Sequence, residues 1–156
     1  MSDEADDNPG VLVFPPFLFL GCFVAGMIAY LVRPSRFALP LGLRGLGGLV
    51  TIAAIVFSLW AQRIMRAAGT NIRPDMPATA IVSDGPFAFS RNPLYLSVLA
   101  MFAGLGVALA SKTFLAVLVP LFLVLHYGVV LREERYLESK FGDTYLVYKT
   151  RVRRWI

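Results

Sequence analysis

Three short segments in the second half of the chain carry residue types that can do chemistry. They are the Arg-Asn-Pro-Leu-Tyr segment at 91–95, the Gly-Leu-Gly segment at 104–106 and the Glu-Glu pair at 133–134. An arginine fork orients anionic groups through paired hydrogen bonds, and carboxylates accept hydrogen bonds from hydroxyl or ammonium groups. Glycines let another group approach a helix backbone closely. Since long apolar runs separate the three segments, they indicate a site where membrane helices end.

The elements that must position these residues are apolar helices. Of the 156 residues, 57% are hydrophobic, which is more than an ordinary soluble domain contains. We therefore expect an all-α, polytopic membrane protein with about four transmembrane helices, at 11–32, 41–61, 93–110 and 114–131. Only three residues join the last two, so these must form a tight antiparallel hairpin.

The chain is expected to form a single membrane domain over residues 1–156. Its expected parts are an acidic N-terminal tail at 1–10, two N-terminal spans at 11–61, a cytoplasmic connecting segment at 62–92, the helical hairpin at 93–131 and a C-terminal catalytic tail at 132–156. In the tail, aromatic and basic residues alternate, which is typical of an amphipathic helix at the membrane interface. A lid over a cytoplasmic pocket is equally compatible with that pattern.

The distribution of lysine and arginine predicts the orientation in the membrane. With four spans, one side of the bilayer carries eleven basic residues: Arg63, Arg66, Arg73, Arg91, Arg132, Arg135, Lys140, Lys149, Arg151, Arg153 and Arg154. The other side carries four: Arg33, Arg36, Arg44 and Lys112. The positive-inside rule then places the termini and the 62–92 segment in the cytoplasm. The net charge of +5 is expected to meet anionic membrane lipids, and no soluble basic domain is present to bind nucleic acid.

Each chemical segment also has a purely structural interpretation. Asn92 suits a helix N-cap and Pro93 the first helical position, and Arg91 suits an anchor that reaches toward lipid headgroups. Gly104 and Gly106 lie within a small-residue surface that is typical of helix packing. The functional interpretation is that the missing side chains let a ligand lie against the helix backbone at these two glycines.

Glu133 and Glu134 follow the fourth span directly. Adjacent residues point about 100° apart on a helix, so the pair cannot act as one bidentate clamp in a regular helix. The structural alternative is a juxtamembrane helix held by salt bridges. His126 lies seven residues before Glu133, close to the same helical face, and is either near the site or a packed polar group.

From about residue 69 to residue 156, the order of these motifs resembles one family. It resembles the integral-membrane, S-adenosylmethionine-dependent methyltransferases of the isoprenylcysteine carboxyl methyltransferase and phospholipid methyltransferase superfamily. The matching pieces are Asp84-Gly85-Pro86-Phe87, Ser90-Arg91-Asn92-Pro93-Leu94-Tyr95, Gly104-x-Gly106, Glu133-Glu134-x-x-Leu137, Phe141-Gly142-x-x-Tyr145-x-x-Tyr148 and Val152-Arg153-Arg154-Trp155. The family often has histidine where this chain has Asn92, so we assign Asn92 no proton-transfer role.

The resemblance implies S-adenosylmethionine bound at the cytoplasmic ends of the last two spans, with a lipophilic acceptor entering from the bilayer and no metal. It implies catalytic roles for Arg91 and Glu134. The cofactor-binding residues it implies are Pro86, Asn92, Pro93, Tyr95, Gly104, Gly106, His126, Glu133 and Glu134. The substrate-binding residues it implies are Tyr145, Tyr148, Arg151 and Arg153.

The expected reaction is methyl transfer to a carboxylate, such as that of an isoprenylcysteine, or to another hydrophobic acid. A phospholipid amine and a thiol stay open as acceptors. A small four-span transporter is an alternative of another class, but it would need an acid within the membrane. The chain has no Asp or Glu between Asp7 and Asp75 or within the third and fourth spans. A structural membrane subunit is a further alternative, and it leaves the order of the motifs unexplained.

Overall fold

The computed structural model describes residues 7–156, so most of the acidic tail expected at 1–10 lies outside the described residues. Within the described part the chain is helical, which confirms the all-α prediction, and its only pairing of extended backbone is an isolated bridge between Arg36 and Ser111. The elements are α1 (Pro15–Val32), α2 (Leu41–Ala67), η1 (Gly85–Ala88), α3 (Pro93–Ala108), α4 (Lys112–Leu125), η2 (His126–Val130), α5 (Leu131–Phe141) and α6 (Asp143–Arg151).

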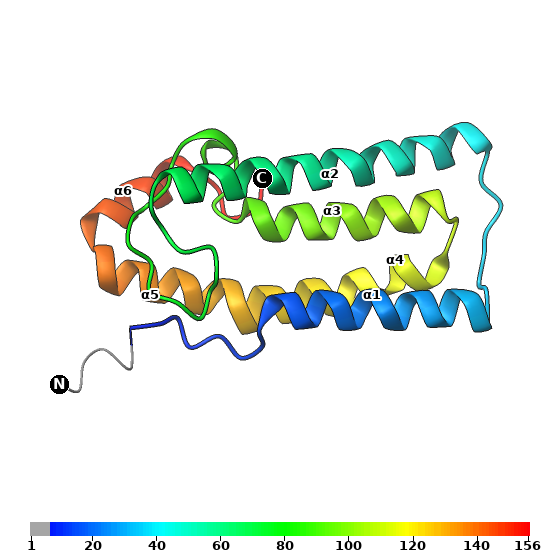
Figure 1. Ribbon diagram of the computed structural model, residues 1–156, viewed down its shortest axis with the longest axis horizontal. Coiled ribbons are helices and arrows are strands. Elements are labelled where there is room, and N and C mark those ends of the chain that lie inside the picture. Colours follow the sequence, from blue (N-terminus) through cyan, green and yellow to red (C-terminus); the bar gives the residue numbers. More distant parts are fainter. Residues whose placement is uncertain (1–6) are drawn as a thin grey trace.

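Helices α1 to α4 run along the long axis of the molecule, as Figure 1 shows, and successive helices run in opposite directions. The N-terminal segment before α1, the connection between α2 and α3, and the C-terminal helices α5 and α6 gather at one end. The short connections at 33–40 and 109–111 lie at the other end, where the Lys112 N–H donates to the Ser35 carbonyl at 2.9 Å. This antiparallel arrangement brings the segments with most of the polar residues together.

Within residues 7–156, three helical stretches are long and apolar enough to cross a membrane: Pro15–Val32, Leu41–Ala67 and Lys112–Phe141. The fourth apolar helix, α3, has 16 residues and is about 24 Å long at 1.5 Å per residue. Many large apolar side chains of α1 and α2 are exposed, as helices that face lipid require. Helix α2 continues to Ala67, past its predicted end at Ala61, because no glycine or proline interrupts it before Gly69.

The last long helix continues past residue 131, where the fourth span was predicted to end. It passes from α4 through the π-helical turn η2 directly into α5, so Glu133 and Glu134 lie in the first turn of a helix that continues the span. A π turn holds an extra residue, which changes the faces on which residues before and after it lie. Consequently His126 and Glu134 both contact the C-terminal residues, whereas Glu133 contacts Tyr95 of α3.

The core has two parts. Phe102, Phe114 and Leu125 are fully buried, and they form a membrane-level cluster together with Leu121 and Val129. A second cluster at the polar end contains Tyr145, Tyr148 and Val152, packed by Ile81, Leu137 and Phe141. The second cluster holds α6 against α5 and the 70–82 segment, and so builds the end of the molecule where the polar residues meet.

Candidate functional site

A cavity of about 140 Å³ opens at this end of the helix bundle. Its walls come from the end of α2, the 70–82 segment, η1, the start of α3, and helices α5 and α6. The lining residues are Pro9, Met65, Thr70, Asn71, Ile72, Arg73, Pro74, Met76, Ala78, Ala80, Ile81, Val82, Phe87, Arg91, Asn92, Pro93, Leu94, Tyr95, Glu133, Glu134, Tyr136, Leu137, Tyr145 and Tyr148. Eight of the residues predicted for the site are among them: Arg91, Asn92, Pro93, Tyr95, Glu133, Glu134, Tyr145 and Tyr148.

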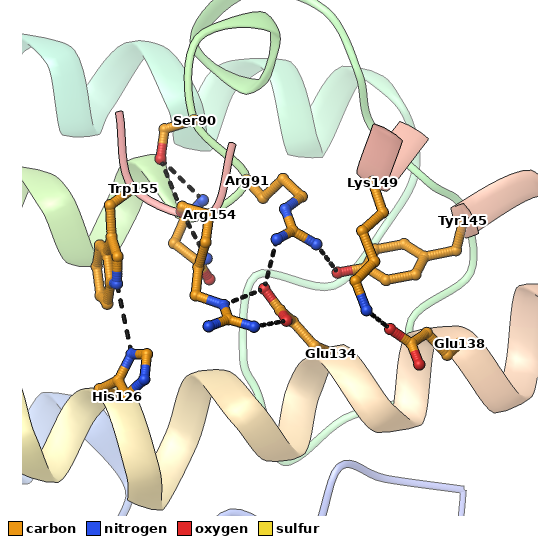
Figure 2. A network of polar contacts seen from close by, with 10 residues as sticks. Ser90, Arg91, His126, Glu134, Glu138, Tyr145, Lys149, Arg154 and Trp155 are labelled. Carbon is orange, nitrogen blue, oxygen red and sulfur yellow. Dashed lines mark hydrogen bonds and ion pairs between the residues drawn. The ribbon is translucent and has the colours of Figure 1, made fainter. Parts of the chain in front are cut away.

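Glu134 is the centre of a buried ion cluster (Figure 2). Arg154 holds this carboxylate with two hydrogen bonds, from Nε to Oε1 at 2.9 Å and from Nη2 to Oε2 at 2.8 Å. Arg91 reaches it from the other side, with Nη2 3.3 Å from Oε1. Glu134 is only 5% exposed, and two cations offset the cost of removing its charge from water.

Arg91 has unused hydrogen-bonding capacity. Its side chain is 8% exposed, and its Nη1 makes a long contact of 3.5 Å to the Tyr145 hydroxyl. Its Nε is buried and has no hydrogen-bond partner within residues 7–156. A buried N–H without an acceptor is costly, and such groups are rare in folded proteins. Because Arg91 lines the cavity, its guanidinium is the candidate group there to bind an anionic or carbonyl oxygen of a ligand.

Glu133 also lines the cavity but has a different environment. Its Oε1 accepts a hydrogen bond from the Tyr95 hydroxyl at 2.7 Å. Within residues 7–156, no ion pair joins it to a lysine or arginine, in contrast to Glu134. The cavity therefore presents one carboxylate that is available to a cationic ligand group.

Two tyrosines of α6 close the polar end of the cavity. Tyr145 is 2% exposed, and its hydroxyl faces Arg91, while the Tyr148 hydroxyl donates to the Phe87 carbonyl at 2.8 Å. Burial raises the pKa of Tyr145 to about 12, and the Glu134 carboxylate adds to that rise. Burial likewise raises the pKa of Tyr148 above its usual range. Both phenols thus stay neutral near pH 7 and provide rigid, uncharged walls.

The start of α3 differs in part from the prediction. The helix does begin at Pro93, but the Asn92 side chain makes no capping hydrogen bond. Its Nδ2 instead donates to the Arg154 carbonyl at 3.0 Å, and its backbone N–H donates to Ser90 Oγ at 3.1 Å. Asn92 therefore ties the C-terminal residues to the start of α3. Pro86 is buried in η1, next to the cavity residue Phe87.

Gly104, Gly106 and His126 are not among the residues that line the cavity, and their predicted cofactor contacts stay predictions. A Cβ added at Gly104 would lie 2.5 Å from Thr51 Oγ1 and 2.7 Å from the Gly47 carbonyl of α2. A Cβ at Gly106 would lie 2.5 Å from Leu115 Cδ2 of α4. Both glycines are thus needed for close helix contact, which is the structural interpretation of this motif.

His126 is a packed polar group on the outside of the ion cluster. Its ring stacks on Phe122 with centroids 5.6 Å apart, and its Nδ1 accepts a hydrogen bond from Trp155 Nε1 at 3.4 Å. Arg151 and Arg153 are exposed, and the part of Arg153 that meets the site is its carbonyl, which accepts the Arg91 N–H at 3.0 Å. Their predicted substrate contacts stay predictions.

Two parts of the site were missed by sequence reasoning. The first is the 70–82 segment, which covers the cavity and is held by hydrogen bonds such as Asn71 Nδ2 to the Pro77 carbonyl at 2.8 Å. Its two prolines, Pro74 and Pro77, signal only an irregular segment. The second is Arg154, which belongs to the Val152-Arg153-Arg154-Trp155 piece but received no site role, because nothing in the spacing distinguishes it from the neighbouring basic residues of the tail. Among residues 7–156, no group of three His, Cys, Asp or Glu side chains is arranged to hold a metal ion.

Residues 43–144 match the model of a family described as phospholipid methyltransferase. A Haemophilus influenzae protein, described only as an uncharacterized protein, is 48% identical over 63 residues, which are 40% of this chain and all of that protein. The cobalt-zinc-cadmium resistance protein CzcN of Cupriavidus metallidurans is 31% identical over 98 residues, 63% of this chain, and the match spans 42% of that protein's length. No solved structure matches the chain.

Proposed function

Because the chain belongs to the phospholipid methyltransferase family and is thus a membrane methyltransferase, we propose that it transfers methyl groups from S-adenosylmethionine to a lipophilic acceptor. The acceptor we propose first is a hydrophobic carboxylate, such as that of an isoprenylcysteine. The observation that carries this proposal is a cavity lined both by Arg91, whose guanidinium has one N–H without a partner in residues 7–156, and by Glu133, which has no ion-pair partner among the same residues. Family membership favours an enzyme over the transporter and the structural subunit.

The donor set of the cavity fits S-adenosylmethionine. The amino-acid part of that molecule carries a carboxylate and an ammonium group, and the cavity offers the guanidinium of Arg91 and the carboxylate of Glu133. When bound, S-adenosylmethionine supplies a methyl group activated by its sulfonium. Arg91 would orient a carboxylate through its free donor, Glu133 would receive a cationic group, and Tyr145 would exclude water. Glu134 would act by fixing Arg91, since the two arginines use its oxygens.

An anionic acceptor suits a cavity with these charges. When a carboxylate attacks a methyl sulfonium, opposite charges are neutralised, so a dry cavity does not oppose the reaction. No proton has to be removed from an ionised carboxylate, and correct positioning supplies much of the rate.

A phospholipid amine or a thiol is the second candidate acceptor. Either group must lose a proton during methyl transfer, and the cavity holds a carboxylate that could accept it. Glu133 lies in the cavity without a cationic partner among residues 7–156 and would accept that proton.

We also propose that the site faces the cytoplasm. The four antiparallel helices put the cavity, the 68–92 connection and the C-terminal tail at one end, and the eleven basic residues of the positive-inside count belong to that end. Cysteine accessibility at this end in intact and permeabilised cells tests the orientation.

The function is tested with purified protein in detergent. Calorimetry with S-adenosylhomocysteine measures cofactor binding, and a screen with radiolabelled S-adenosylmethionine compares hydrophobic acids, prenylated thiol acids, phospholipid amines and thiols. A carboxylate acceptor gives turnover that is flat above about pH 6, whereas an amine gives turnover that rises toward the amine pKa. Absence of S-adenosylhomocysteine binding by folded protein would overturn the proposal.

A further inference from the structure

The last five residues, 152–156, form a strap that crosses the start of α3 and the long helix made of α4, η2 and α5 (Figure 2). We call these residues the C-terminal strap. Val152 is buried in the second core cluster, and the carbonyl of Arg153 accepts the backbone N–H of Arg91 at 3.0 Å. Trp155 packs on Phe122 with ring centroids 5.3 Å apart. The strap is thus attached at three successive points along its length.

Two buried polar side chains just before α3 donate hydrogen bonds to the backbone of the strap. Ser90 is fully buried, and its Oγ donates to the Arg154 carbonyl at 3.3 Å. Asn92 is 8% exposed and donates to the same carbonyl from Nδ2 at 3.0 Å. Both residues flank Arg91, so the backbone on either side of this arginine is fixed by the strap.

The side chain of Arg154 completes the connection. It forms the bidentate pair with Glu134, and Glu134 Oε1 receives both Arg154 Nε at 2.9 Å and Arg91 Nη2 at 3.3 Å. A bidentate pair fixes the plane of the carboxylate, and the carboxylate in turn fixes the guanidinium of Arg91. Arg154 is not among the residues that line the cavity, so it acts on the cavity through Glu134.

We infer that Arg154 is a positioning residue: it clamps the C-terminal strap to Glu134 and thereby holds the guanidinium of Arg91 in place at the wall of the cavity. This inference rests on the proposed function for its effect on cofactor binding. The clamp itself is independent of that function. The Trp155–His126 hydrogen bond attaches the strap to η2 at one further point.

The test uses the full chain in which Trp60 is replaced by Phe, so that Trp155 is the single tryptophan. Acrylamide quenching of Trp155 then reports whether the strap is seated, and calorimetry with S-adenosylhomocysteine reports the cavity. Arg154→Lys keeps the charge but loses the fork, and we expect it to increase quenching and to weaken binding about tenfold. The matched control Arg135→Lys changes an exposed arginine on the outward side of α5 and should alter neither reading.

A double-mutant cycle separates positioning from general destabilisation. In a Glu134→Gln background, Arg154→Lys should add almost nothing to the loss of affinity, because its effect passes through that carboxylate. Wild-type affinity in Arg154→Lys would overturn the positioning role, and unchanged quenching would overturn the clamp. If the wild-type chain itself does not bind S-adenosylhomocysteine, the proposed function fails, while the quenching data still decide whether Arg154 holds the strap.

Discussion

The two ends of α3 carry neighbouring parts of one sequence motif, yet they do different work. At the start of the helix, Arg91 and Tyr95 face a cavity and have polar partners on α5 and α6. Nearer its other end, Gly104 and Gly106 are buried against α2 and α4. Charged and glycine segments that follow one another in the sequence are thus separated along the axis of a single helix. The first of these segments therefore supplies polar groups to the cavity, while the glycine segment lets α3 approach α2 and α4 closely.

Replacing Arg91 by lysine should have the largest effect on activity, because it removes the guanidinium at the polar end of α3. Lysine keeps the charge but cannot contact Glu134 and a ligand with a planar fork, so we expect kcat/KM to fall about a hundredfold, or about 3 kcal/mol. Thermal stability in detergent should change little. The measurement is methyl transfer with the best acceptor from the screen, with Arg135→Lys as control. Near-normal transfer by Arg91→Lys would make Arg91 a membrane anchor, since the positive-inside rule counts both residues equally.

The substitution Gly104→Ala tests the packed end of α3. Its new methyl group would meet backbone atoms of α2, 2.7 Å from the Gly47 carbonyl, and two helix backbones must separate to accept it. We expect a loss of about 2 kcal/mol of stability from overpacking. A thermal melt and S-adenosylhomocysteine calorimetry on the same sample should show a lower Tm with unchanged affinity in the folded fraction. A normal Tm with lost affinity would instead place the cofactor against this helix.

The substitution Glu133→Gln sharpens the comparison within the polar end, where two adjacent glutamates differ. Glutamine can still accept the Tyr95 hydrogen bond but has no charge, so the attraction for the ammonium group that S-adenosylmethionine and S-adenosylhomocysteine share is lost. We expect S-adenosylhomocysteine to bind about tenfold more weakly, a cost of about 1.4 kcal/mol, with Tyr95→Phe having a smaller effect. Equal affinity in the Glu133→Gln and wild-type proteins would remove Glu133 from the cofactor site.

The smallest effect is expected for Gly106→Ala. The nearest atoms to its new methyl group are Leu115 Cδ2 at 2.5 Å and Cγ at 2.8 Å, so the Leu115 side chain must change its conformation, whereas at Gly104 two of the three nearest atoms belong to the backbone of α2. Alanine also favours the helix over glycine by about 1 kcal/mol, which offsets part of the packing cost. The free energy of unfolding should therefore change by less than about 1 kcal/mol, in contrast to Gly104→Ala. The bulkier Gly106→Leu should lower Tm clearly while the folded fraction binds S-adenosylhomocysteine normally, and lost binding at normal Tm would contradict the packing role.

Much of the fold follows from the sequence for local reasons. The apolar runs are long enough to define helices in a membrane, where backbone groups must be hydrogen-bonded internally, and Pro93 starts α3 because its ring suits the first helical position. The continuation of α4 through η2 into α5 as one long helix was not predictable from composition. The run of charges after residue 131 signals the edge of the bilayer, but a helix continues there as readily as it ends.

The sequence by itself determined the membrane class, the family, and the gathering of Arg91, Tyr95, Glu133 and Glu134 at one end of the helix bundle. Those conclusions depend on hydrophobicity and on the order of motifs, which are local properties. Only the tertiary structure decided that Glu134 forms ion pairs with two arginines whereas Glu133 faces Tyr95. The π turn at 126–130 decides this because it sets the side of α5 on which each glutamate lies. It also decided the role of Arg154, which lies 20 residues after Glu134 and meets it only because α6 turns the chain back toward α3.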